Sequence, residues 1–482
     1  MAGTWSDLSS QPGVSIDTML LLTDGRVFCH ESQSNRWHTL TPSDTGDYSN
    51  GSWNTAESLP DNTNIPASFG GPTNAPTFFA SAVLGDGRVF VAGGEYNSTQ
   101  STGNDSLAAQ IYDPGTGHWT AISTPTGWTE IGDAVSCVLP DGRVMLGQPN
   151  GNAVALYDPH LDLWTFTSKK GDSCSEETFT LMPDNTVVTV QCSNANNAEK
   201  YIIATDKWVS AGATPSALPQ PCSGQVAEIG PAILLPSGKL LAVGATGNTA
   251  IYDPTQPTAS AWTAGPTLTD AGNNTSFPMD APGVLLPNGK VLLAGSPSPP
   301  CDYPAPTTFF EYNPATNKAP LVSSPSGSDV AVFQARFLLL PTGEVLYSNN
   351  SSTISMYKPD GAPRVAWKPT ISNAPTDLMH EHTYLLSGTQ FNGLSQACSY
   401  GDDAQMATNY PLVRITNTAT NKVRYLPTSH HSTMGVATGS TTVTTNVTVP
   451  NDVPTGQYSL VIVANGIASN PITVNVVGET AS

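Results

Sequence analysis

The chain has few charged side chains, and positively charged ones are the scarcest. Among 482 residues, Lys and Arg together number 18 against 38 Asp and Glu, which gives a formal net charge of -20. Such a surface repels phosphate backbones and anionic lipids, so we expect no nucleic-acid partner. No apolar run approaches the roughly 18 residues that a membrane-spanning helix needs, so we expect no membrane insertion.

The sequence also lacks C-x-x-C motifs and shows no signal-peptide pattern. The seven cysteines lack C-x-x-C spacing, which argues against zinc or thioredoxin-type sites, and we expect one or two disulfides plus a free thiol. The first ten residues have neither the basic nor the apolar part of a signal peptide, although a trimmed secreted chain would look the same. N-x-S/T sequons such as that at Asn50 give weak support to secretion, so we expect an extracellular protein. We also expect it to be a monomer.

Glycine and proline, by contrast, are abundant, and a hairpin motif recurs seven times. An apolar strand, a tight turn and a second apolar strand appear in "FASAVLGDGRVFV", "APGVLLPNGKVLLA" and five similar segments. Asp-Gly and Asn-Gly suit the left-handed dihedrals of such turns. The spacing of 43 to 62 residues between turns fits one four-stranded blade per repeat. The turns begin at Asp24, Asp86, Asp141, Asp184, Ser237, Asn288 and Thr342.

The repeats predict an all-β fold. Tyr and Trp recur seven residues apart in the third and fourth strands, as at Tyr112 and Trp119, and are best explained as core between blades. With the Gly-Gly pairs, they indicate a seven-bladed kelch-type β-propeller over residues 1–369, which "GTWSDL" at residues 3–8 is expected to close by completing the last blade. Alternating segments such as "GQYSLVIVANG" predict an immunoglobulin-like (early-set) β-sandwich over residues 370–482.

A kelch propeller followed by such a sandwich resembles the galactose oxidase and glyoxal oxidase family of copper-radical oxidases over essentially the whole chain. The resemblance implies copper on the propeller axis, held by two tyrosines and two histidines, with one tyrosine cross-linked to a cysteine under a stacking aromatic ring. Counting back from the turns places Ile16 at the cysteine and Phe78 at the cross-linked tyrosine. Phe333 and Gln334 replace the tyrosine–histidine pair, and Tyr96 is the stacking aromatic.

Only the family's sandwich histidine is retained, as His431 or its neighbour His430. Phenylalanine has no oxygen to bind copper or carry a radical, isoleucine cannot form a thioether, and one histidine cannot retain Cu(II). We therefore expect no copper and no copper-radical oxidation.

Acidic residues occupy the equivalent strand starts of other repeats. Since strand starts converge on one mouth of a propeller channel, we expect these carboxylates to lie together beside Phe78, Phe333 and the His430–His431 hairpin. Mutual repulsion should raise at least one pKa. The acids eight or nine residues before the turns are Asp133, Glu176, Glu228 and Asp280, with Asp17 and Glu177 beside them.

Such a set has three uses. Unequal carboxyl groups can act as general acid and base, or acid and nucleophile. Oxygens can hold Ca²⁺ or another divalent cation. The ring can also bind a cationic or polyhydroxylated ligand between Phe78 and Tyr96. Arg336 is expected to neutralise one acid. The structural alternative is that these acids only cap loops.

We predict a secreted, copper-free relative of galactose oxidase whose axial pocket performs non-redox acid/base chemistry, of hydrolase or lyase type, on a carbohydrate or small polar molecule. The alternatives are a carbohydrate-binding or adhesion propeller and a metal-dependent oxidoreductase. The expected catalytic residues are Glu176, Asp280, Asp133, Glu228 and His431. The expected substrate contacts are Phe78, Tyr96, Phe333, Gln334, Arg336, His430, Asp17 and Glu177.

Two further motifs stand apart from this set. "MHEHTY" carries His380 and His382 with the spacing of a metal pair on one strand face, although an incidental pair is the simpler interpretation. The polar segment 395–411 is interpreted as a cover over the propeller mouth, with a calcium site and a plain connection as alternatives.

Overall fold

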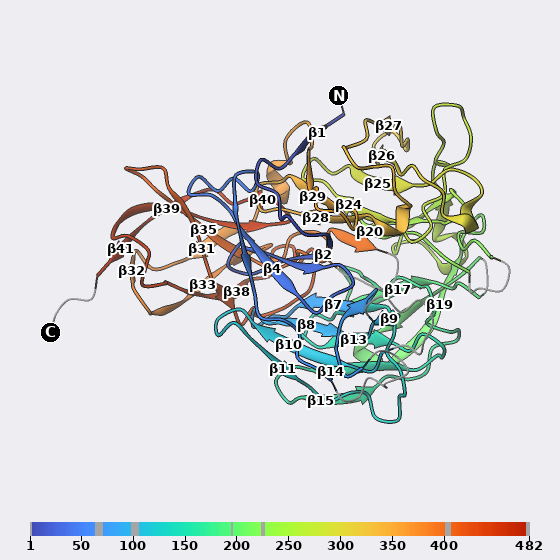
Figure 1. The fold of residues 1–482 in the computed structure, drawn as a ribbon, viewed down its shortest axis with the longest axis horizontal. Helices are drawn as coiled ribbons and strands as arrows, with labels where there is room; N and C mark the ends of the chain where they lie inside the picture. The colour runs from blue at the N-terminus through green and yellow to red at the C-terminus, as the bar shows by residue number, and fades with distance from the viewer. Residues whose placement is uncertain are drawn as a thin grey trace.

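The computed structural model describes residues 2–62, 71–97, 106–193, 196–222, 227–400 and 406–478 (Figure 1). Within them the fold is all-β, as predicted, and seven antiparallel sheets form the blades of a propeller. Each of the first six blades runs outward from the axis in chain order. Their strands are β2 (Ile16–Leu21), β3 (Val27–Glu31), β4 (Trp37–Thr41) and β5 (Ser52–Thr55); β7 (Ala80–Val83), β8 (Val89–Ala92), β10 (Ala109–Asp113) and β11 (His118–Ala121); β12 (Ser136–Val138), β13 (Val144–Gly147), β14 (Val154–Asp158) and β15 (Leu163–Phe166); β16 (Thr180–Leu181), β17 (Thr186–Val190), β18 (Asn197–Ile202) and β19 (Lys207–Ala213); β20 (Ala232–Leu234), β21 (Leu240–Val243), β22 (Thr249–Tyr252) and β23 (Trp262–Ala264); and β24 (Pro282–Leu285), β25 (Val291–Gly295), β26 (Thr308–Tyr312) and β27 (Leu321–Val322).

The seventh blade joins the two ends of the propeller sequence. It consists of β28 (Arg336–Leu339), β29 (Val345–Ser348), β30 (Ser355–Lys358) and, outermost, β1 (Thr4–Asp7). β1 pairs antiparallel with β30, in a register that sets Trp5 opposite Tyr357. The Trp5 ring also contacts Phe309 of the sixth blade, with ring centroids 5.3 Å apart. The predicted closure by "GTWSDL" is therefore confirmed.

Aromatic rings fill the space between blades, as the Tyr and Trp spacing predicted. Phe28 of the first blade stacks on Tyr112 of the second at 4.5 Å between centroids, and Trp119 packs against both. All three are buried. Because each repeat places its aromatic residues at the same positions, the same layer of rings recurs between successive blades.

The chain beyond residue 369 forms two further sheets that share one apolar core, which includes Leu378, Leu386 and Val413. The immunoglobulin-like assignment and the boundary at residue 369 remain predictions. One sheet consists of β31 (Thr370–Asn373), β33 (Thr383–Thr389), β38 (Val443–Thr448) and β37 (Thr428–Ser429). The other consists of β32 (Asp377–Met379), β41 (Ile472–Val477), β39 (Gly456–Ala464), β35 (Leu412–Asn417) and β36 (Val423–Leu426), with β40 (Ile467–Ala468) paired to β39.

One strand from this C-terminal part enters the propeller. β34 (Cys398–Tyr400) pairs antiparallel with β24, the innermost strand of the sixth blade, and sets Tyr400 opposite Pro282. It is the orange strand beside β20 in Figure 1. The chain returns alongside it, since the amide of Thr408 donates to the carbonyl of Gln396 at 3.0 Å. The propeller channel is therefore occupied by a segment that begins in the C-terminal sheets.

The remaining elements are short. β6 (Pro76–Thr77) pairs with β9 (Tyr96–Asn97) at the entrance to the second blade. None of the described helices is long and apolar enough to cross a membrane. Those helices are single 3₁₀ turns, η2 (Ile203–Thr205), η3 (Thr258–Ser260), η4 (Pro300–Asp302), η5 (Val332–Gln334) and η6 (Val365–Trp367).

The cysteines form one disulfide, between Cys222 and Cys301. The other five are buried free thiols, so the expectation of a single leftover thiol is wrong. Three of them lie on strands β3, β12 and β34, and the other two lie in the segments before β16 and after β17. These five are Cys29, Cys137, Cys174, Cys192 and Cys398.

Candidate functional site

Three of the predicted carboxylates converge at one mouth of the propeller. Glu176, Glu228 and Asp280 precede the innermost strands of the fourth, fifth and sixth blades, and each offers an oxygen within 4.8 Å of the other two. All three side chains are half-buried. We refer to them as the acid trio.

The local backbone aims these side chains. Phe78, Glu176 and Asp280 have φ values of 52°, 55° and 49°, in the left-handed region that non-glycine residues rarely adopt. At Asp280 the turn is held by the next blade, because its amide donates to the carbonyl of Ile229 at 3.1 Å. Gly230 makes this approach possible, since a Cβ there would lie 2.5 Å from the carbonyl oxygen of Pro278.

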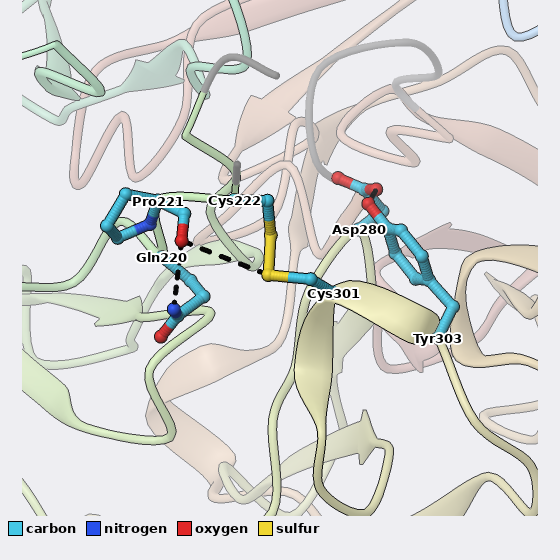
Figure 2. The surroundings of a disulfide bond; sticks show 6 residues. All are labelled: Gln220, Pro221, Cys222, Asp280, Cys301 and Tyr303. Atoms are coloured by element: carbon cyan, nitrogen blue, oxygen red, sulfur yellow. Dashed lines mark hydrogen bonds between the residues drawn. A yellow bond between two sulfur atoms is a disulfide. The ribbon is translucent and has the colours of Figure 1, made fainter. Parts of the chain in front are cut away.

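Tyr303 is the direct partner of the trio, and a disulfide holds it in place (Figure 2). Its hydroxyl donates to Oδ2 of Asp280 at 2.6 Å. Tyr303 follows Cys301, whose disulfide with Cys222 links this turn to the strand segment that precedes Glu228. Burial and the neighbouring carboxylates hold the Tyr303 pKa well above its usual value, so Tyr303 stays a donor.

The charge state of the trio follows from these contacts. Burial raises the pKa of Asp280, against the opposing hydrogen bonds with Tyr303 and Glu228 and the charge of Arg336. A hydrogen bond between two carboxyl groups requires a proton on one of them. Where Asp280 and Glu228 bond to each other, one of the two carboxyl groups therefore carries the proton.

Asp133 forms a second acidic position beside the trio. Burial, followed by the charges of Glu95 and Asp280, raises its pKa to about 7. The Gly-Gly pair brings this position close to Glu95, because the amide of Gly94 donates to the carbonyl of Gly132 at 2.7 Å. A Cβ on Gly93 would lie 2.0 Å from the same oxygen. Glu95 was not predicted as a site residue, although it directly follows the Gly93–Gly94 pair in the sequence.

Aromatic rings and one buried arginine form the other wall. The guanidinium carbon of Arg336 lies 3.4 Å from the ring centroid of Tyr400 and 5.6 Å from that of Phe78. Phe333 packs edge-on against Phe78 and Tyr303, at 6.1 Å and 5.2 Å between centroids. The hydroxyl of Tyr400 donates to the carbonyl of Phe333 at 2.6 Å.

Two other predicted substrate contacts are Tyr96 and Gln334. The Tyr96 ring lies 6.0 Å from that of Phe78. Gln334 is half-buried in η5. Tyr400 and Tyr303 were not predicted as site residues: Tyr400 was noticed only as part of the 395–411 segment, and no local pattern singles out Tyr303.

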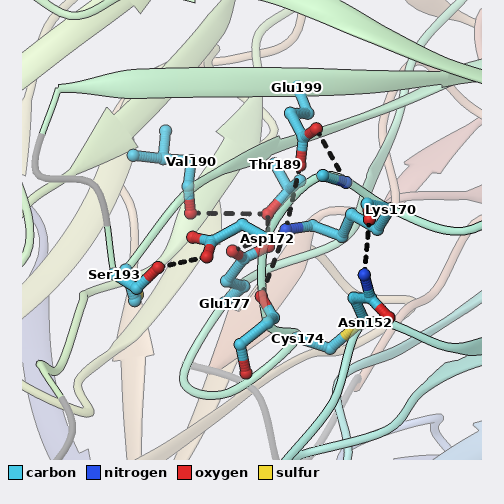
Figure 3. Close-up of polar contacts among 12 residues, drawn as sticks. Asn152, Lys170, Asp172, Cys174, Glu177, Thr189, Val190, Ser193 and Glu199 are labelled. Atoms are coloured by element: carbon cyan, nitrogen blue, oxygen red, sulfur yellow. Dashed lines mark hydrogen bonds and ion pairs between the residues drawn. The ribbon is translucent and has the colours of Figure 1, made fainter.

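Two predicted acids belong to other networks. Glu177 is fully buried and bonds Nζ of Lys170 at 2.8 Å and the hydroxyl of Thr189 at 2.6 Å (Figure 3). Asp17 is buried against His30, with Oδ1 and Nδ1 2.8 Å apart. Since both carboxylates are already paired inside a blade, we correct their assignment from substrate contacts to structural ion pairs.

The histidines lie at the other end of the propeller. The amide of His431 donates to the carbonyl of Gly85, in the turn that ends β7, whereas Phe78 precedes the start of that strand. His430 and His431 instead line a pocket with the turn residues Asp86 and Asp141. Burial lowers the pKa of His431 to about 3. The predicted contact between the histidine hairpin and the acids is therefore wrong: the segment that reaches the acid mouth is β34.

Of the two remaining motifs, the histidine pair is engaged elsewhere and the 395–411 segment contributes one residue to the site. Nε2 of His380 bonds the carbonyl of Val453, and Nδ1 of His382 bonds the carbonyl of His380, so each imidazole is already engaged. Within the 395–411 segment, Tyr400 reaches the acid mouth, but Asp402 and Asp403 lie outside the described residues. The expected cover over the mouth stays a prediction.

The donor set decides which metals fit. Phe78 and Phe333 offer no ligand atom, and the acid trio offers only carboxylate oxygens, which suit hard cations such as Ca²⁺ rather than copper. Among the described residues, no other set of three potential ligands lies so close together. The acid trio therefore suits a hard cation better than the copper that the family resemblance implies.

Comparison with known proteins identifies the fold. No family model matches the sequence, and no curated protein matches it. A fungal alcohol oxidase of the AA5 family, solved with copper, is similar in structure with a TM-score of 0.51 and 15% identity, over 99% of each chain. A catalytically inactive variant of virginiamycin B lyase from Staphylococcus aureus, solved with quinupristin, aligns with a TM-score of 0.46 and 11% identity over 74% of this chain and 99% of its own. The first likeness shows that this chain has the fold of a galactose oxidase-family enzyme.

Proposed function

We propose that this protein is a secreted, copper-free enzyme that performs acid/base chemistry on a carbohydrate or similar small polar molecule at the acid trio. The observation that carries the proposal is the convergence of Glu176, Glu228 and Asp280, which each offer an oxygen within 4.8 Å of the other two, with the Tyr303 hydroxyl bonded to Asp280. An unequal pair of carboxyl groups supplies an acid and a base in one place. The disulfide between Cys222 and Cys301 supports an oxidising, extracellular location.

The spacing within the trio favours particular reactions. Its oxygens lie within 4.8 Å of one another. Inverting glycoside hydrolysis needs carboxyl groups about 6.5–9.5 Å apart to admit a water, whereas retaining hydrolysis uses about 5–5.5 Å. The trio therefore suits direct attack by a carboxylate, or an elimination in which one carboxylate removes a proton. The half-buried faces of Phe78 and Tyr96 would contact the substrate ring.

Each acidic residue has a distinct role in this proposal. Glu176, the member with no part in the Asp280–Glu228 bond, is the nucleophile or base. The Asp280–Glu228 pair donates its proton to the leaving group, and Tyr303 orients Asp280 through its hydroxyl. Asp133 titrates at about pH 7 and exchanges protons with solvent between turnovers. Arg336 limits the negative charge that builds up around the pair.

Turnover of glycosides and uronides by the full chain tests the proposal. Glu176→Gln and Asp280→Asn should each reduce kcat at least a hundredfold while circular dichroism and Tm remain close to wild type. Asp141→Asn, which changes an acid in an exposed turn, is the matched control and should retain full activity. If the trio variants keep wild-type turnover, or if every substrate class fails with the native protein, the enzymatic proposal is wrong.

The same trio supports a second candidate, a non-catalytic carbohydrate-binding module that uses Ca²⁺. Three carboxylate oxygens already within 4.8 Å are the observation in its favour. In that case calcium should bind at one site per chain, and ligand binding should disappear on chelation and in Glu228→Gln. Turnover that persists after chelation would contradict this candidate and favour the enzyme.

A further inference from the structure

Acidic groups outnumber basic ones at the mouth that holds the acid trio. Asp133 adjoins the trio, since its pKa responds to the charges of Glu95 and Asp280. With Asp133 and Glu95, the trio brings five carboxyl groups together, and Arg336 contributes one positive charge that acts on Asp280. Even with one proton on Asp133 and another on the Asp280–Glu228 pair, the mouth keeps a net negative charge.

The positive charge of Arg336 is engaged inside the aromatic wall. The residue is buried, and its Nη1 donates to the carbonyls of Phe333 at 2.6 Å and Ala335 at 3.0 Å. Its guanidinium carbon lies 3.4 Å from the ring centroid of Tyr400. Because these contacts hold Arg336, an acidic ligand that meets the carboxylates gains little from it. The mouth therefore favours a cationic ligand over an anionic one.

The spacing of the acid trio suits the three N–H groups of a primary ammonium. Three acceptors placed about 2.9 Å from one tetrahedral nitrogen, along its N–H bonds, lie about 4.7 Å from one another. The trio offers one oxygen from each member, and these oxygens all lie within 4.8 Å of one another. One ammonium nitrogen can therefore bond all three. Each carboxyl group has a second oxygen, which stays available for the acid and base roles.

Aromatic rings beside the acids can hold the rest of such a ligand. The Phe333 ring lies 5.2 Å from that of Tyr303, which bonds Asp280. The Tyr96 ring directly follows Glu95 in the sequence. Phe333 and Tyr96 are half-buried, so part of each side chain stays open to solvent. Aromatic faces attract cations and give an apolar surface to a ligand ring.

We propose that the ligand of the acid mouth is an amino sugar, whose primary ammonium group bonds one oxygen from each member of the acid trio. Phe333 and Tyr96 contact its ring. This inference rests on the proposed function, because it takes the trio as the ligand site, and it adds charge as the basis of selection. Amino sugars bind, uncharged sugars bind weakly and uronic acids are excluded.

Calorimetry on the full chain tests this inference, with a chelator present so that no metal ion contributes. The probes are the methyl glycosides of glucosamine and galactosamine, their N-acetylated forms, and methyl glucuronide. N-acetylation keeps the nitrogen and removes its charge, so each amino sugar should bind at least tenfold more tightly than its N-acetylated form. The uronide should bind least. Raising the salt concentration from about 50 mM to about 500 mM should weaken only the binding of the amino sugars.

Two variants locate the ammonium group. Glu176→Gln should lower the affinity for amino sugars at least tenfold and leave that for the N-acetylated forms within about twofold. Asp141→Asn, which changes an exposed acid in a turn at the other end of the propeller, is the matched control and should change neither. An equal loss of affinity in Asp141→Asn would overturn the inference, because the net charge of -20 would then explain the attraction.

The ligand comparison and the salt series need only the native protein, so a misfolded variant does not protect the inference. Equal affinity for the amino and N-acetylated sugars, or tighter binding of the uronide, would overturn it. Charge-selective binding without turnover of any glycoside would refute the enzyme and leave the amino-sugar site in place. Turnover of uncharged glycosides that requires Glu176, with no preference for the amino group, would support the enzyme and refute the inference.

Discussion

Asp133→Asn should stabilise the protein, and more strongly at pH 8 than at pH 5. Burial and the Glu95 carboxylate raise the Asp133 pKa from 3.8 to about 7 in the folded protein. The folded state therefore holds this proton more tightly than the unfolded chain, and stability is lost as the pH rises from about 4 to about 7. Ionisation of Asp133 therefore lowers the free energy of unfolding by about 2 kcal/mol at pH 5 and about 4 kcal/mol at pH 8. An Asn at this position does not ionise, so the variant avoids this loss.

Urea unfolding of the native protein and Asp133→Asn at both pH values measures this directly. The gain in unfolding free energy should increase by about 2 kcal/mol between pH 5 and pH 8. Glu95→Gln removes the largest neighbouring charge, so it should lower the Asp133 pKa and reduce the pH dependence. Asp141→Asn serves as the control for a simple change in net charge. An equal gain at both pH values, or a less stable Asn variant, would refute the reasoning.

Three further changes have defined outcomes. Tyr303→Phe removes the hydroxyl that donates to Asp280 and so raises the Asp280 pKa further, and the alkaline limb of a pH–rate profile, which reports loss of the proton that this pair donates, should move up by about one pH unit. Lys170→Met leaves Glu177 buried without a counter-charge and should cost about 3–5 kcal/mol in urea unfolding. Lys170→Met with Glu177→Leu should restore only part of this, because Glu199 has also lost its ion pair with Lys170. Gly93→Ala places a Cβ 2.0 Å from a carbonyl of the next blade, so Tm should fall and the contact beside the acid site should open.

The propeller was predictable because the sequence of each repeat determines the structure of one blade. Asp-Gly and Asn-Gly turns fix a hairpin locally, and the Tyr and Trp positions fix its packing against the next repeat. The acid trio was predictable for a related reason. Glu176, Glu228 and Asp280 lie eight or nine residues before their turns, and such similar offsets in successive blades point to one place on the axis.

Neighbouring residues show where this reasoning stops. Glu177 is one position from Glu176, yet a shift of one residue directs the side chain into the blade, where Lys170 holds it. The position of Tyr303 depends on the Cys222–Cys301 disulfide, and the spacing of cysteines along the sequence does not show which of them pair. Tyr400 arrives on β34, a three-residue strand from the other part of the chain. Such long-range placements depend on tertiary packing rather than on local pattern.

The backbone at the acid mouth argues for function independently of the side-chain chemistry. Phe78, Glu176 and Asp280 start strands in three different blades, and all three take left-handed dihedrals that glycine would adopt without strain. Each such residue costs about 1–3 kcal/mol. Glycine would remove this strain, as it does at Gly93 and Gly94 nearby. The strained positions instead carry an aromatic ring and two carboxylates, and the carboxylates converge, so a ligand that contacts these side chains is the simplest reason for them.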